Sequence, residues 1–144
     1  MYMKTKASML TRSLAVAAIF SAISMGAATA EDVAVKLTGV QEVPAVTTSA
    51  SGTGSISIGK DGAVSGSVQT SGIAGTMAHI HLASAGTNGP PIISLVKSGD
   101  NTWTVPGGAK LTEDQYKSFK NGDLYVNVHS DAHKGGEIRA QLKP

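Results

Sequence analysis

The four histidines of this chain occur as two close pairs, His79 with His81 in "MAHIHLASAG" and His129 with His133 in "NVHSDAH". Imidazole nitrogens bind copper, zinc, iron and nickel ions. A single His-x-His pair is common, and histidines can also simply fix loops through hydrogen bonds. Two pairs in one small protein instead predict one metal site in which these four residues supply three or four ligands. The affinity order of divalent ions favours copper for such a set, with iron or zinc as alternatives.

Both pairs lie in segments with the alternation of β-strands. Side chains at i and i+2 share a face of a strand, so His79 and His81 in the expected strand 76–83 project together. The residues that alternate with them face the core in this prediction, namely Ala78, Ile80 and Leu82. The expected strand 124–130 has a core stripe of Leu124, Val126 and Val128, and its other face carries Tyr125, Asn127 and His129. If the two polar faces meet, the imidazole nitrogens converge.

Further short strands are expected where β-branched residues alternate with small or polar ones. These segments are 33–40, 53–59, 63–70, 92–96 and 137–143. Asp61-Gly62 predicts a hairpin turn, and the Gly/Pro-rich stretch 85–91 predicts a loop. One helix is expected after Thr112, with Gln115 completing a capping box and Gly122 ending it. The pattern predicts an all-β, antiparallel Greek-key sandwich or barrel of about seven or eight strands with one short helix.

Residues 1–30 resemble a signal peptide. Lys4, Lys6 and Arg12 form a basic beginning, an apolar stretch follows, and Ala28-Thr29-Ala30 has the small-x-small form of a cleavage site. An uncleaved membrane anchor is the less favoured alternative, because the apolar run is shorter than the ~20 residues that a span needs. We therefore expect a periplasmic or secreted protein whose single folded domain comprises residues 31–144.

Composition argues against several function classes. The leader holds three of the twelve basic residues and none of the ten acidic ones, so residues 31–144 carry nine basic and ten acidic side chains. Such a domain lacks the basic surface typical of nucleic-acid binding, and no stretch has the pattern of a membrane-surface helix. The chain has no cysteine, which excludes disulfides and thiolate ligands. The sequence leaves the oligomeric state open.

Other catalytic arrangements are weaker. Ser130, Asp131 and His133 contain the residue types of a serine hydrolase triad, but they are sequence neighbours without a nucleophile elbow. Glu42 and Glu137 could form a carboxylate pair, although "QEVP" at 41–44 is more typical of a strand end and Glu137 could pair with Arg139 instead.

Three ordered segments carry a family resemblance: "LTGVQEVPAVTTSASGTGSISI" (37–58), "GTMAHIHLASAGTNGPPIISL" (75–95) and "GDLYVNVHSDAHKGGEIRAQL" (122–142). They resemble the signature blocks of the CHRD domain, a family named after chordin. Its motif positions correspond here to His79, His81, Asn88, Gly89, Asn127, His129, His133, Gly136, Glu137 and Arg139. The resemblance implies an immunoglobulin-like or Greek-key β fold in a secreted protein.

A more distant similarity concerns copper/zinc superoxide dismutases, which also use a His-x-His strand and a later histidine for copper. In that comparison Arg139 is the catalytic residue that attracts superoxide, and Tyr125, Asn127 and Glu137 lie around the metal ligands. The family's cysteine pair and zinc loop are missing here, so the similarity implies a copper-only enzyme. The alternatives are a non-catalytic extracellular interaction module and a protein for copper storage or delivery.

Overall fold

The computed structural model describes residues 29–144. The predicted signal peptide lies outside the described residues except for its last two positions, and the first strand begins at Ala30. The elements in chain order are β1 (Ala30–Thr38), η1 (Gly39–Gln41), β2 (Ser51–Gly59), β3 (Val64–Ser71), β4 (Gly75–Leu82), β5 (Pro91–Ser94), β6 (Val96–Gly99), β7 (Thr102–Thr104), α1 (Glu113–Lys120), β8 (Leu124–Ser130) and β9 (Ile138–Leu142).

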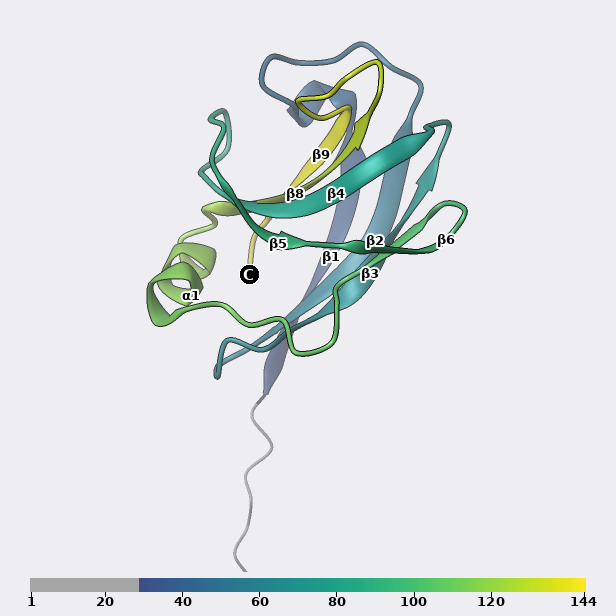
Figure 1. The fold of residues 1–144 in the computed structure, drawn as a ribbon. Coiled ribbons are helices and arrows are strands. Elements are labelled where there is room, and N and C mark those ends of the chain that lie inside the picture. The colour runs from purple at the N-terminus through teal and green to yellow at the C-terminus, as the bar shows by residue number, and fades with distance from the viewer. Residues whose placement is uncertain (1–28) are drawn as a thin grey trace, which may run out of the picture.

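The nine strands form one antiparallel sheet in the order β5-β4-β8-β9-β1-β2-β3-β7-β6. The sheet curls into a nearly closed barrel (Figure 1), with β5 and β6 at its two ends. The connection between these ends is the single residue Leu95, whose N–H donates to the carbonyl oxygen of Ala78 at 2.9 Å. The predicted all-β antiparallel fold with one short helix is therefore confirmed.

The strand number is slightly higher than predicted, for two reasons. The expected strand 92–96 divides at Leu95, whose side chain is buried in the core while its backbone bonds back to β4. In addition, Thr102–Thr104 pairs with both β3 and β6. Trp103 in this short strand is 4% exposed, so it belongs to the core.

β4 and β8 pair with each other and carry the histidines. The apolar sides of these strands face the core as predicted, because Ile80, Val126 and Val128 are fully buried. All seven residues of β8 are buried, including those on its polar face. The reason is that loops cover this second face: the long connection after β1 and the turn between β8 and β9 come together at one end of the sheet (Figure 1). Both faces of β8 are therefore buried, one against the apolar core and the other in a layer of polar side chains.

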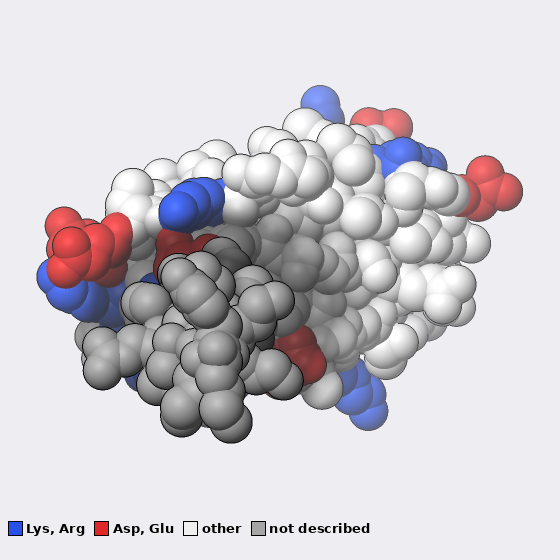
Figure 2. Space-filling view, turned by 90° about the horizontal axis from the view of Figure 1, so that it is seen from below, with Lys and Arg blue, Asp and Glu red and all other residues white. Residues whose placement is uncertain are grey.

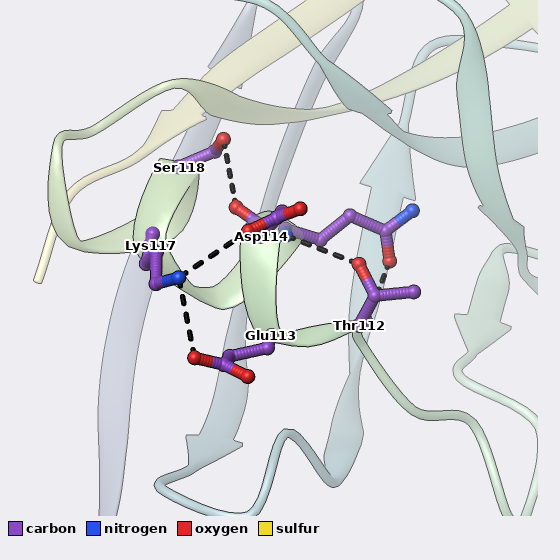
Figure 3. Close-up of polar contacts among 6 residues, drawn as sticks. Thr112, Glu113, Asp114, Lys117 and Ser118 are labelled. Carbon is purple, nitrogen blue, oxygen red and sulfur yellow. Dashed lines mark hydrogen bonds and ion pairs between the residues drawn. The ribbon is translucent and has the colours of Figure 1, made fainter.

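The helix begins as the sequence predicts. The Thr112 side chain accepts from the Gln115 N–H at 3.2 Å, and the Gln115 side chain accepts from the Thr112 N–H at 2.9 Å. Figure 3 shows this capping box together with Lys117, which contacts both Glu113 and Asp114. Gly122 follows the helix with a φ of +79°, a conformation that glycine adopts without a Cβ penalty.

Among residues 29–144, no helix is long and apolar enough to cross a membrane. On the part of the face in Figure 2 that grey atoms do not cover, basic side chains lie in small groups together with acidic ones. That face therefore shows no continuous basic surface, in agreement with the near-neutral charge of the domain.

Candidate metal centre

Three histidines from β4 and β8 lie together on the polar face of the sheet. One ring nitrogen from each of His79, His81 and His129 lies within 4.8 Å of the other two. The His79 Nδ1 and His129 Nε2 atoms are 3.1 Å apart. Strand register produces this cluster, because His79 and His81 pair across the ladder with Asn127 and Tyr125, next to His129. In the part of the chain that the structure describes, this is the group of histidine or acidic side chains close enough to hold an ion.

Hydrogen bonds to loop carbonyls determine the tautomers of two rings. The Nδ1 atom of His81 lies 2.8 Å from the carbonyl oxygen of Gly89. The Nδ1 atom of His129 lies 2.8 Å from the carbonyl oxygen of Lys134. A carbonyl oxygen only accepts, so both Nδ1 atoms carry the proton and each neutral ring has its lone pair on Nε2. Metal-binding histidines are commonly oriented in this way.

The His81 Nε2 atom is buried and has no hydrogen-bond partner. Burial without a partner is costly for a polar atom, and an electron-pair acceptor in the cluster would satisfy it. Burial also lowers the pKa of His79 and of His81, and the neighbouring His129 lowers it further. The hydrogen bond to Gly89 and the Asn127 side chain oppose this effect at His81, the charge of Arg139 adds to it, and the net change is a lowered pKa. Burial therefore favours, at His79 and His81, the neutral form that binds metals.

Two further side chains, Tyr125 and Arg139, stack in sequence on one face of the His81 ring. The Tyr125 ring stacks on the His81 ring with centroids 4.6 Å apart and an interplanar angle of 5°. Arg139 lies against Tyr125, with its Cζ atom 3.4 Å from the Tyr125 ring centroid. The imidazole, phenol and guanidinium groups thus form a column of three planar groups, which restricts the rotation of His81.

The Arg139 side chain is 1% exposed and holds the loop between β4 and β5. Its Nη1 donates to the carbonyl oxygen of Thr87 at 2.9 Å, and its Nη2 donates to that of Ser84 at 3.2 Å. The same loop supplies Gly89, the hydrogen-bond partner of His81. This placement supports a positioning role for Arg139, whereas its predicted catalytic role stays a prediction.

A scan against family models supplies the decisive comparison: the CHRD domain model matches residues 33–142. The chain belongs to the CHRD domain family. The match covers β1 from Val33 onward, every later strand and all four histidines, so the resemblance to the CHRD domain is confirmed. CHRD domains occur in extracellular or secreted proteins. No curated protein and no solved structure matches the chain.

In this CHRD domain His133 lies apart from the three clustered rings. Its side chain lines a cavity of about 220 Å³ together with Glu42, Pro44 and Asn88. The backbone N–H of His133 donates to the Ser130 Oγ at 3.1 Å. Strand alternation had no bearing on His133, because it follows β8 in a turn rather than lying in the strand.

Glu137 does not pair with Arg139. Its carboxylate accepts hydrogen bonds from the Thr48 hydroxyl at 2.7 Å and the Ser130 hydroxyl at 2.5 Å. Burial opposes ionisation of Glu137, but these two hydrogen bonds and the nearby His133 outweigh it, and the net effect lowers the pKa of the carboxyl. Through these two hydrogen bonds, Glu137 connects Thr48 in the loop after η1 with Ser130 at the end of β8.

Glu42 is a buried carboxyl that the sequence reasoning undervalued. It is 5% exposed, and its Oε1 atom accepts from the Asn127 Nδ2 at 3.4 Å. Burial raises the pKa of Glu42 to about 7, although Asn127 and the charge of Arg139 act in the opposite direction. The Oδ1 atom of Asn127 is buried without a partner. The position of Glu42 in the first CHRD block was a signal for it, but which residues it would meet depended on loop packing.

Gly136 makes room for this contact. Its φ is +123°, and a Cβ atom there would collide with the Glu42 Oε1 and the Asn127 Nδ2. The Gly-Gly turn between β8 and β9 is thus required for the polar layer as well as for the chain reversal.

Proposed function

We propose that this CHRD domain is a periplasmic or secreted copper-binding protein whose three-histidine site supports superoxide dismutation. The observation that carries the proposal is the pair of Nδ1–carbonyl hydrogen bonds, which leave two Nε2 lone pairs beside His79 within a 4.8 Å cluster. The Nε2 of His81 is buried and forms no hydrogen bond, so its lone pair fits a metal ion. The ligands in this proposal are His79, His81 and His129.

The donor set narrows the choice of metal. Three imidazoles without a carboxylate or thiolate suit copper or zinc better than magnesium or calcium, and the divalent affinity order places copper above zinc, nickel and iron. When bound, copper would supply one-electron redox chemistry: one superoxide ion would lose an electron and leave as dioxygen, and a second would gain that electron and two protons from solvent to form hydrogen peroxide. Zinc lacks this redox chemistry, so a zinc-loaded site would not support dismutation.

The chain's own residues would prepare the site for that chemistry. Gly89 and Lys134 hold the tautomers of His81 and His129 through their carbonyl oxygens. The column of Tyr125 and Arg139 holds the plane of His81, and the buried guanidinium adds positive potential that favours a small anion. His79 is only half-buried, which makes its side of the cluster the route by which superoxide would arrive.

The test begins with copper(II) titration of the metal-free protein, followed by isothermal calorimetry. We expect one tight site per chain. The double variant His79→Ala/His81→Ala should lose affinity by more than ~100-fold, because even outer partners of metal ligands are worth about 10- to 100-fold. His133→Ala is the matched control, since it removes an imidazole outside the cluster, and it should bind copper like the wild type. Equal binding by the double variant would overturn the site.

A second measurement separates binding from catalysis. The copper-loaded wild type should accelerate superoxide decay well beyond buffer, and the zinc-loaded protein should not. If copper binds but superoxide decay matches buffer, the dismutase part fails and a copper storage or delivery role is favoured. If no copper binds, a non-catalytic extracellular interaction module is favoured instead.

A further inference from the structure

Met77 lies on the same strand face as the two histidines of β4. Residues 77, 79 and 81 alternate with the buried Ala78 and Ile80, so their side chains point to one side of the sheet. Met77 is 48% exposed, His79 is half-buried and His81 is 7% exposed. The strand therefore runs from a buried imidazole to an exposed thioether, and Met77 borders the open side of the three-histidine cluster.

Strand register also brings Met77 opposite His129. The pairing of β4 with β8 is irregular between Gly75 and Met77, and beyond this irregularity Met77 and His129 are direct cross-strand partners. Direct partners in an antiparallel pair have Cβ atoms about 4.5–5.5 Å apart. Bulges of this kind often re-aim a side chain next to a functional site. Met77 thus neighbours His79 along the strand and His129 across it.

The chemistry of this side chain differs from that of its neighbours. Met77 holds the sole sulfur atom of residues 29–144, because the chain has no cysteine and its other methionines, Met1, Met3, Met9 and Met25, precede that range. The remaining exposed large hydrophobic residues of the described chain are two valines, Val40 and Val96. Thioether sulfur is a soft ligand that selects copper(I), and the unbranched side chain adapts readily to a nearby site.

We propose that Met77 is a thioether ligand for copper(I) at the three-histidine site. This inference rests on the proposed copper function and adds a fourth ligand to it. Three imidazoles accept either oxidation state of copper, whereas a thioether favours the reduced ion. Met77 therefore strengthens the binding of copper(I) with little effect on zinc(II), which prefers nitrogen and thiolate donors.

The test compares the full-chain wild type with Met77→Leu, which removes the sulfur while keeping the size of an exposed side chain. Copper(I) affinity is measured anaerobically by competition with a chromogenic copper(I) chelator, and zinc(II) affinity is measured in parallel. We expect Met77→Leu to weaken copper(I) binding on the order of tenfold or more and to change zinc(II) binding by less than about twofold. Unchanged zinc(II) binding also shows that the variant keeps its fold.

X-ray absorption at the copper edge supplies a readout independent of affinity. Copper(I) in the wild type should show sulfur in its first coordination shell, and Met77→Leu should lose it, which identifies the residue. Copper(I) held by nitrogen alone, with equal affinity in both proteins, would overturn the role of Met77 and leave the three-histidine proposal standing. Equal copper binding by His79→Ala/His81→Ala would overturn both, because Met77 would then have no imidazole site to complete.

Discussion

Replacing Glu42 with glutamine should change the pH dependence of folding stability in a direction that the structure specifies. The pKa of Glu42 is raised by burial from 4.5 to about 7 in the folded protein. Its protonated form is therefore favoured by folding, and the resulting stability is fully present below pH 4.5 and is lost as pH rises through 7. Glutamine has the shape of the protonated acid and does not titrate, so Glu42→Gln should avoid this loss.

The magnitude follows from the two pKa values. One pKa unit corresponds to ~1.4 kcal/mol, so an unscreened carboxylate would cost about 3 kcal/mol at pH 8. Glu42 lines a cavity of about 220 Å³, and partial screening from that side reduces the expected cost to about 1–2 kcal/mol. Glu42→Gln should therefore be more stable than the wild type by about 1–2 kcal/mol at pH 8, with the difference disappearing near pH 4.5.

Urea unfolding at a series of pH values measures this difference. The fluorescence of Trp103 is a suitable signal, because it is the only tryptophan and is 4% exposed. A chelator keeps the histidines free of metal, and their titration cancels in the comparison at each pH. Glu137→Gln is the matched control with the opposite sign: the lowered pKa of Glu137 contributes stability above its unfolded pKa that is lost as pH falls.

Two results would refute the reasoning. One is a stability difference between Glu42→Gln and the wild type that stays constant from pH 5 to pH 8. The other is a pH trend of Glu42→Gln that has the same direction as that of Glu137→Gln. Either result would mean that burial does not control the ionisation of Glu42.

Four other outcomes are expected. Arg139→Lys should lower stability in urea unfolding by about 2–4 kcal/mol, since lysine cannot reproduce the forked donation to two buried loop carbonyls. An effect below about 1 kcal/mol would contradict the role of Arg139 in holding the loop between β4 and β5. Gly136→Ala should cost about 2–4 kcal/mol by the same assay, through positive φ and collision with the polar layer. Because the pKa values of His79 and His81 are lowered, protons compete less for these ligands, and a pH titration should show copper retained below the ordinary histidine pKa of ~6.5. Thr112→Ala should lose about 1 kcal/mol in thermal or urea unfolding, as expected for an N-cap.

Local rules were sufficient for much of the fold. Alternation at 76–82 and 124–130 predicts which side chains enter the core, and Ile80, Val126 and Val128 are fully buried. The capping box at Thr112 and the stop at Gly122 also depend only on nearby residues. The extra strands were missed because Thr102–Thr104 is too short for a periodic signal, and because the break at Leu95 depends on a bond to β4.

The candidate site shows the same division. That His79 and His81 share a face follows from their spacing alone, because alternation is a property of the extended backbone. Three placements follow only from the packed fold. His129 joins the two histidines while His133 lies apart, Arg139 stacks on Tyr125, and Glu42 is buried beside Asn127. These placements depend on strand pairing and on loops from distant parts of the chain. Their chemistry comes from burial and hydrogen bonds that form once the loops pack over β8.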